Sequence, residues 1–322
     1  MVPIRKADSS DLGPTLNPAR PRPRRPPTSI YYSPLRYPGG KRKLANFLGL
    51  VYRLNGLLDG EYAEVYAGGG AVALALLYGD YVRRVHLNDL DDGVHAFWVA
   101  CRDRTDELCR LVRDAKLDID EWERQRAIQL SSDADPLELA FSTLYLNRTN
   151  HSGILRGGII GGRQQAGSWR MDARFNTEDL ARRIERIGRW ASRIEIYHSD
   201  GADFLGQVAE KLGRKALVFL DPPYYVKGQE LYANFYEPAD HAGIADSVRR
   251  LPVPWVVTYD DQPEVRALYS GCQTLTYEIA YGAGGRYRGR EVAFFSDDLE
   301  LPDVADPARF SASQLARYLR TA

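Results

Sequence analysis

The stretch Ala216-Leu217-Val218-Phe219-Leu220-Asp221-Pro222-Pro223-Tyr224-Tyr225 decides the fold that the sequence predicts. Its apolar residues form a short run with no helix-length continuation, which is typical of a buried strand. The strand must end at Asp221, because two consecutive prolines lack the N–H groups that a central strand donates. We therefore expect Asp221 at the carboxyl end of a buried strand, which is the edge of an open α/β sheet where ligands bind.

The residues that follow this strand suit the methylation of an exocyclic amino group on a nucleic-acid base. Such a nitrogen is a poor nucleophile, because its lone pair is delocalised into the ring, and it needs acceptors for its hydrogens. Asp221 and the carbonyl of Pro222 can accept them. The ring of Tyr224 can stack on an extruded base, which is worth about 1–3 kcal/mol. A plain strand followed by a Pro-Pro turn is the alternative interpretation.

At these residues the sequence resembles the amino-methyltransferases that use S-adenosylmethionine, whose catalytic motif is Asp/Asn/Ser-Pro-Pro-Tyr/Phe. The Asp form implies adenine N6 or cytosine N4 as the methyl acceptor. The resemblance also implies that Asp221, Pro222 and Tyr224 are catalytic, and that Asp221 contacts the cofactor as well.

A second signal lies upstream, where a strand predicted over residues 61–66 runs into Ala67-Gly68-Gly69-Gly70 and then into a helix. Strand, glycine turn and helix form the unit that cradles nucleotides. The spacing is not Gly-x-Gly-x-x-Gly, which argues against a nicotinamide-dependent oxidoreductase. It resembles the methyltransferase pattern Glu-x-Phe/Tyr-x-Gly-x-Gly, which implies that Tyr66, Gly68 and Gly70 bind S-adenosylmethionine. Because Ala-Gly-Gly-Gly departs from the commoner spacing, it leaves open which glycine touches the cofactor.

The segment Tyr37-Pro38-Gly39-Gly40-Lys41 precedes an amphipathic helix predicted from about residue 42 to 54. It resembles the aromatic-x-Gly-Gly-Lys segment that opens the domain of the DNA adenine methylase family. Gly40 allows close backbone approach to a ligand, and Lys41 can reach the cofactor carboxylate or the catalytic site. Tyr37 is a candidate cofactor contact and a second platform for the base. A plain turn with a helix cap is the alternative.

Two acidic residues follow other predicted strands. Asp89 comes after the strand at 82–87 and is placed to accept hydrogen bonds from ribose hydroxyls. Asp200 comes after the strand at 194–197, where an acidic residue in this class of fold can bind the amino group of the cofactor's adenine. Both are therefore predicted cofactor contacts.

A polar stretch over residues 147–176 mixes Gly, Arg, Asn, Gln and aromatic residues with no helical or strand period. Arginines of such a stretch can contact phosphates, and Arg, Asn and Gln can contact base edges; a polar surface loop is the alternative. Its Asn-Arg-Thr-Asn-x-Ser-Gly segment and downstream Arg-Phe-Asn closely resemble the same family. We predict a mainly helical target-recognition insert over residues 115–176. Its expected DNA contacts are Asn147, Arg148, Asn150, Arg156, Arg163 and Arg174.

The remaining segments define the other predicted boundaries. Residues 1–29 form a Pro- and Arg-rich disordered tail, residues 30–114 and 177–300 form the catalytic domain, and residues 301–322 form a C-terminal tail or helix. The basic loop 282–290 lies between two predicted strands. It either grips DNA phosphate through Arg286 or is a plain flexible loop.

Composition limits these predictions. The formal net charge is zero, so nucleic-acid contacts must be local and cannot come from a global basic field. The three cysteines and five histidines show no metal-site spacing, so no metal is expected. No apolar run approaches the roughly 18 residues of a membrane span, and no signal core is present. We expect a cytoplasmic protein with no membrane partner.

Over about residues 31–297 the order of these motifs resembles the DNA adenine methylase family. The resemblance implies an α/β, Rossmann-like class I methyltransferase fold with a mostly parallel seven-stranded sheet and an antiparallel strand in its last hairpin. It further implies S-adenosyl-L-methionine as cofactor and site-specific N6 methylation of a flipped adenine in double-stranded DNA.

Three alternatives stay open. A ribosomal or other RNA adenine methyltransferase would share the catalytic residues, whereas the glycine spacing disfavours the oxidoreductase. A non-catalytic nucleic-acid-binding relative is disfavoured by the intact Asp221 to Tyr224. The DNA recognition sequence, a cognate restriction endonuclease as partner and the oligomeric state cannot be read from the sequence.

Overall fold

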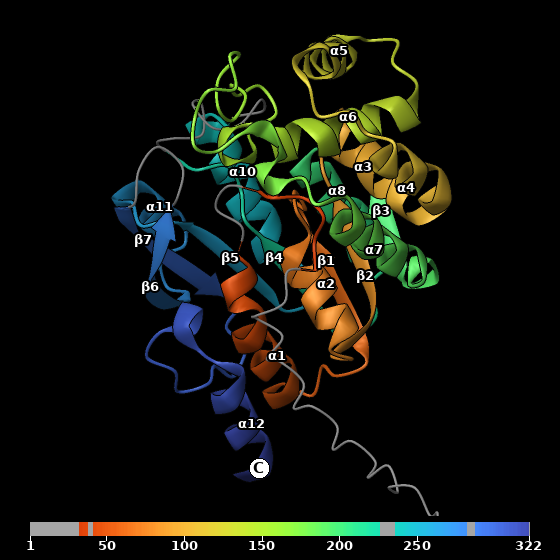
Figure 1. Ribbon diagram of the computed structural model, residues 1–322. Coiled ribbons are helices and arrows are strands. Elements are labelled where there is room, and N and C mark those ends of the chain that lie inside the picture. The colour runs from red at the N-terminus through yellow and green to blue at the C-terminus, as the bar shows by residue number, and fades with distance from the viewer. Residues whose placement is uncertain (1–31, 38–40, 226–235, 282–286, 322) are drawn as a thin grey trace, which may run out of the picture.

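The computed structural model describes residues 32–37, 41–225, 236–281 and 287–321. Its centre is a seven-stranded sheet with the order β3-β2-β1-β4-β5-β7-β6 (Figure 1). Neighbouring strands from β3 to β5 are parallel, whereas β7 is antiparallel to both β5 and β6. The predicted α/β class, with a mostly parallel seven-stranded sheet and an antiparallel strand in the last hairpin, is confirmed. The strands are β1 (Gly60–Glu64), β2 (Val82–Asn88), β3 (Ile194–Tyr197), β4 (Ala216–Leu220), β5 (Trp255–Asp260), β6 (Gln273–Tyr281) and β7 (Tyr287–Phe295).

Helices cover both faces of this sheet. Strand β4 shows why, because its side chains alternate between two apolar cores. Leu217 and Phe219 belong to the larger core, and Val218 and Leu220 belong to the smaller one. The larger core contains residues of helices α1 (Ala45–Leu54), α2 (Ala71–Tyr78), α3 (Asp92–Asp103), α4 (Thr105–Arg113), α6 (Pro136–Thr149) and α7 (Thr177–Gly188), and the smaller core contains residues of α8 (Gly201–Ala209), α10 (Pro238–Arg249) and α11 (Pro263–Leu268).

The order of the strands determines where a ligand can bind. Strand β1 pairs with β2 on one side and with β4 on the other, so the chain changes direction across the sheet at this point. In open α/β sheets such a switch point opens a crevice at the carboxyl ends of the strands. The glycine turn, Asp89 and Asp221 directly follow β1, β2 and β4, respectively. Topology therefore brings these three sequence signals together.

The predicted insert over residues 115–176 contains α5 (Ile119–Leu130), α6 and two short 3-10 helices, His151–Gly153 and Met171–Arg174. Helix α6 packs against both α3 and α5, and every residue from Ala140 to Thr149 is buried. The first part of the insert thus shares the main core of the molecule. That the whole insert acts in target recognition stays a prediction.

The structure describes the C-terminal segment of the chain but not the first 31 residues. The predicted tail at residues 1–29 lies outside the described residues. The last segment contains a 3-10 helix (Pro307–Arg309) and α12 (Ala312–Thr321), which lies beside α1 (Figure 1). Within the described ranges, no helix combines the length and apolar character that crossing a membrane requires.

Candidate active site

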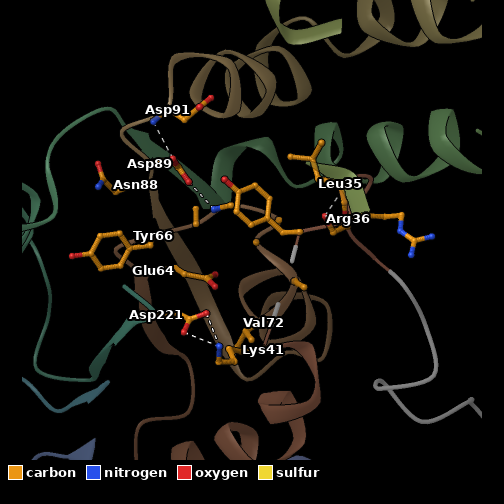
Figure 2. A pocket seen from close by; sticks show the side chains of 18 of the residues that line it. Leu35, Arg36, Lys41, Glu64, Tyr66, Val72, Asn88, Asp89, Asp91 and Asp221 are labelled. Atoms are coloured by element: carbon orange, nitrogen blue, oxygen red, sulfur yellow. Dashed lines mark hydrogen bonds and ion pairs between the residues drawn. The ribbon is translucent and has the colours of Figure 1, made fainter. Parts of the chain in front are cut away.

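A cavity of about 890 Å³ opens where β1, β2 and β4 end. It is lined by the glycine turn Gly68–Gly70, by Asp89 and by Asp221, and the segment 32–37 forms part of its wall. Figure 2 shows Asp221 and Lys41 at one end and Asp89 with Asp91 at the other. Signals that are far apart in the sequence therefore share one cavity.

The glycine turn needs its glycines for two reasons. Gly68 and Gly70 have φ angles of 43° and 54°, which residues other than glycine rarely adopt. A Cβ atom at Gly68 would also lie 2.8 Å from the ring of Tyr37, and one at Gly70 would lie 2.6 Å from the ring of Trp98. Trp98 donates from Nε1 to the carbonyl of Gly68 at 3.0 Å. The two aromatic rings thus clamp the turn against the cavity.

Asp89 fixes the neighbouring end of the cavity. One carboxylate oxygen accepts from the backbone N–H of Gly68 at 2.7 Å, and the other accepts from that of Asp91 at 3.0 Å (Figure 2). Burial raises the pKa of Asp89 to about 6, although both backbone hydrogen bonds act in the opposite direction. Asp89 therefore ties β2 to the glycine turn, and its predicted contact with ribose hydroxyls stays a prediction.

Asp221 is held by two donors. The ammonium of Lys41 lies 2.8 Å from Oδ1 and 2.9 Å from Oδ2, and Thr258 donates its hydroxyl to Oδ1 at 2.8 Å. The side chain of Asp221 is 21% exposed and lines the cavity. Burial raises the pKa of Asp221 to about 6, while Lys41 acts to lower it and Glu291 to raise it further. The carboxylate is thus fixed, yet open to a ligand in the cavity.

Lys41 is almost completely buried, with 2% of its side chain exposed. Its ammonium also lies 3.3 Å from the carboxylate of Glu291 on β7. Burial by itself would lower the pKa of Lys41, but the charges of Asp221 and Glu291 outweigh burial and hold that pKa well above its usual value. The sequence predicted that Lys41 reaches either the cofactor carboxylate or the catalytic site. In the structure Lys41 contacts Asp221 at the catalytic site.

Tyr224 is buried, with 7% exposed, and it does not line the cavity. Its hydroxyl donates to Glu291 at 3.3 Å, and the ammonium of Lys41 lies 5.4 Å from the centre of its ring. Pro222 is buried beside it. The predicted stacking of Tyr224 on a base requires the ring to become accessible, and the predicted role of the Pro222 carbonyl remains a prediction.

Asp200 caps α8, because its carboxylate accepts from the backbone N–H of Ala202 at 2.8 Å. It also accepts from the hydroxyl of Tyr236 at 3.2 Å, and Tyr66 donates to that same hydroxyl at 3.0 Å. Tyr66 and Tyr236 line the cavity, whereas Asp200 does not. The predicted contact of Asp200 with the cofactor's adenine therefore has no direct support in this arrangement.

The family model for "D12 class N6 adenine-specific DNA methyltransferase" matches residues 37–281, which include every strand of the sheet in whole or in part except β7. The chain belongs to this family. The match spans the glycine turn, the polar stretch and Asp221. The protein is thus a methyltransferase that depends on S-adenosylmethionine.

Comparison with solved structures finds other methyltransferases at low identity. A proposed RNA methyltransferase from Pyrococcus horikoshii is 12% identical over 79% of this chain and 83% of its own, with a TM-score of 0.38. The rRNA methyltransferase AviRa from Streptomyces viridochromogenes is 13% identical over 84% and 86%, with a TM-score of 0.33. TM-scores of this size carry no argument about the substrate. No curated protein matches the sequence significantly.

The cavity of the methyltransferase suits S-adenosylmethionine, which carries an ammonium, a carboxylate and a ribose. Glu64 is 6% exposed and lines the cavity, and its Oε2 has no hydrogen-bond partner. In Figure 2 this carboxylate lies between Tyr66 and Asp221. A buried carboxylate oxygen without a donor is costly, and an ammonium group in the cavity would satisfy it. Glu64 is therefore a residue that would hold the ammonium of the cofactor, whereas cofactor contacts of the glycine turn and Asp89, which line the same cavity, stay predictions.

Three residues of the predicted DNA-binding set, Asn147, Arg148 and Asn150, are buried and have partners within the protein. Asn147 and Asn150 are 1% and 0% exposed. Asn147 accepts from the N–H of Arg36 at 2.7 Å and donates to the carbonyls of Arg36 and Gly153, both at 2.8 Å. Asn150 accepts from Nε1 of Trp122 at 2.7 Å. These amides are already used within the methyltransferase, so contact with DNA would require rearrangement.

Arg148 is also turned inward. Its guanidinium donates to the carbonyl of Pro34, and it lies beside Arg183, which donates to the carbonyl of Ser33 at 2.9 Å. Burial, together with the neighbouring charges of Arg183 and Arg36, lowers the pKa of Arg148 to about 9. Together with Asn147, these side chains fasten the cavity wall at residues 32–37 to α6 and α7.

The other predicted DNA contacts lie on or near the surface. Arg156 is exposed and lines the cavity mouth, Arg163 is exposed and pairs with Glu123 at 2.9 Å, and Arg174 is half-buried. Gly40 and Arg286 lie outside the described residues. The polar stretch thus divides into a buried part that supports the cavity and an exposed part.

Sequence reasoning missed three residues of the site. Glu64 had a local signal, because it opens the Glu-x-Tyr-x-Gly pattern before the turn. Thr258 and Glu291 had none, because they reach Asp221 and Lys41 from β5 and β7 only through the pairing of the strands.

Proposed function

We propose that this methyltransferase transfers the methyl group of S-adenosylmethionine to N6 of an adenine that is flipped out of double-stranded DNA. The observation that carries the proposal is the position of Asp221, at the end of β4, in the same cavity as the glycine turn. Membership of the D12 family supports adenine in DNA as the substrate.

The residues at the end of β4 give the reaction its mechanism. The ionised carboxylate of Asp221 accepts a hydrogen bond from the amino group, so the nitrogen lone pair localises and can attack. The carbonyl of Pro222 accepts from the second hydrogen. When bound, S-adenosylmethionine supplies a methyl group on a sulfonium, which is a good leaving group. A nitrogen–carbon bond forms as the sulfur–carbon bond breaks, the electron pair of that bond stays on sulfur as a neutral thioether, and the nitrogen then gives a proton to the carboxylate of Asp221.

Electrostatics at Asp221 fit this role. A carboxyl with a pKa of about 6 is ionised at neutral pH, yet it accepts a proton more readily than an ordinary aspartate. Lys41 keeps the charge of the carboxylate balanced inside the protein.

The exposed part of the polar stretch is the proposed DNA contact. Trp169 is 73% exposed, which is unusual for so large an apolar side chain. The loop that carries it is held by Gln165, whose side chain donates to the carbonyls of Ile160 and Gly162 and accepts from the N–H of Met171. Arg156 and Arg163 lie in the same stretch. An aromatic ring among arginines suits stacking on bases and contact with phosphates.

The experiment that tests this function uses unmethylated double-stranded DNA, S-adenosylmethionine and the purified protein, followed by digestion to nucleosides and mass spectrometry. We expect N6-methyladenine from the wild type and none from Asp221→Ala. N4-methylcytosine would keep the mechanism and change the base. Product on RNA and none on DNA would replace the proposed substrate, and cofactor binding without any product would indicate a non-catalytic relative.

A further inference from the structure

Glu291 lies in a buried polar cluster next to Asp221. It belongs to β7, and its side chain is 0% exposed. Tyr277 on β6 donates to Oε2 at 2.9 Å, while Oε1 lies 3.3 Å from the hydroxyl of Tyr224 and 3.3 Å from the ammonium of Lys41. A buried carboxylate can only accept hydrogen bonds, so this set of three donors matches its needs.

Two carboxylates share the ammonium of Lys41. Its Nζ atom contacts both oxygens of Asp221 and one oxygen of Glu291. A buried charge that loses its partner costs several kcal/mol, so the two carboxylates together stabilise the ammonium of Lys41 at this position. The second carboxylate therefore fixes where the ammonium stands relative to the first.

Glu291 also reaches the last residue of the Asp-Pro-Pro-Tyr motif through the hydroxyl of Tyr224. Glu291 therefore contacts both Lys41, which pairs with Asp221, and Tyr224, which follows Asp221 in the motif. Glu291 does not itself line the cavity. We propose that Glu291 is a positioning residue for methyl transfer, holding Lys41 and Tyr224 in place beside Asp221 without contacting the substrate. This inference rests on the proposed function of Asp221.

Removing the charge at position 291 should change the pKa of Asp221 in a defined direction. A negative charge at Glu291 disfavours ionisation of Asp221 and raises its pKa, so a neutral residue there lowers the pKa of Asp221. The same charge raises the pKa of Lys41, so its loss lowers that pKa as well. The charged, titratable or hydrogen-bonding groups that surround Asp221 are Lys41 from the start of the first helical segment, Tyr62 and Glu64 from β1, Thr258 from β5, Tyr277 from β6 and Glu291 from β7.

The first test compares Glu291→Gln with the wild type in the DNA methylation assay. We expect kcat to fall by about 10- to 100-fold, because the reacting groups lose their alignment. The acid limb of the kcat profile should move to lower pH, and the Kd of S-adenosylmethionine by calorimetry should stay unchanged. Glu278→Gln on the neighbouring strand is the matched control, since Glu278 is 53% exposed. An acid limb that stays in place would overturn the proposal.

A second measurement does not depend on methyl transfer. Acylation of lysine requires the neutral amine, and Lys43 is an exposed reference two residues away. We expect the rate of labelling at Lys41, relative to Lys43 by mass spectrometry, to rise in Glu291→Gln. An unchanged ratio overturns the positioning role even if the wild type methylates DNA. A rise in a protein that methylates nothing supports that role and rejects only the proposed function.

If Glu291→Gln does not fold, Tyr277→Phe replaces it. This variant removes one donor to Glu291 and leaves the charge in place. We expect a smaller fall in kcat, a higher labelling ratio at Lys41 and an acid limb at its wild-type position. Wild-type values for both kcat and the labelling ratio would overturn the proposal.

Discussion

The catalytic end of the cavity and the polar stretch over residues 147–176, which begins in the last turn of α6, use polar residues in opposite ways. At the catalytic end, Asp221, Lys41 and Glu291 pair side chain to side chain, and Asp221 stays partly open to the cavity. In the polar stretch, Asn147 and Arg148 bind backbone groups and are closed off. A polar residue is available for chemistry when its partners leave it open to the cavity, and it stabilises the fold when it is buried and bound to backbone groups.

The strongest test of this contrast is Asp221→Asn, which keeps the size of the side chain and removes its charge. We expect kcat to fall by about 10²–10⁴-fold, because the amino group loses its charged acceptor. Stability should also fall, because the buried ammonium of Lys41 loses one of its two carboxylates, whereas the Kd of the cofactor should change far less. Steady-state kinetics, thermal unfolding and calorimetry measure these three quantities. Asp203→Asn, at an exposed aspartate of α8, is the matched control.

Asn147→Ala should lower stability and cofactor affinity rather than act on the chemical step. Loss of its hydrogen bonds to the backbone of Arg36 and Gly153 removes three buried or part-buried contacts, which costs about 1–3 kcal/mol of unfolding free energy. Since residues 32–37 line the cavity, cofactor affinity should fall as well. Urea unfolding and calorimetry test this, with Asn176→Ala, a helix cap with one hydrogen bond, as control. Weaker DNA binding with normal cofactor binding would instead support the prediction that Asn147 contacts DNA.

Trp169→Ala sharpens the comparison within the polar stretch. Loss of stacking should weaken DNA binding by about 1–3 kcal/mol, and it should leave cofactor binding and stability unchanged because the ring is exposed. Fluorescence anisotropy with labelled duplex DNA measures the effect. Leu130→Ala removes an apolar side chain that is similarly exposed, at 71%, and serves as control. Equal effects of both variants would argue against a specific role for Trp169.

Glu64→Gln should give the smallest change. Burial raises the pKa of Glu64 well above its usual value, so the folded protein favours the protonated form. Above the pKa of the unfolded chain, the wild type therefore loses stability as pH rises, and the variant does not. We expect Glu64→Gln without cofactor to be more stable than the wild type at pH 8, and the difference to vanish near pH 4. A constant difference across this range would contradict the pKa shift.

Local signals in the sequence were sufficient for much of this molecule. The strand before Asp221 and the glycine turn each combine residue types that dictate their own conformation, so both could be predicted. The partners of polar residues could not, because those partners come from distant elements. Composition alone cannot tell that Asn150 contacts Trp122 of α5, or that Thr258 and Glu291 reach the catalytic end.

Because the hairpin of β6 and β7 comes late in the chain, the order of chain synthesis affects when the active site can form. Lys41 and Asp221 are 180 residues apart, and Glu291 comes later still, on the strand inserted between β5 and β6. A nascent chain can form the glycine turn and the Asp-Pro-Pro-Tyr end before it can form the complete buried cluster. Because contacts between such distant residues form late in folding, the site would be completed only with the last strand. A split protein, divided before β6, should therefore regain activity only when its two fragments reassociate.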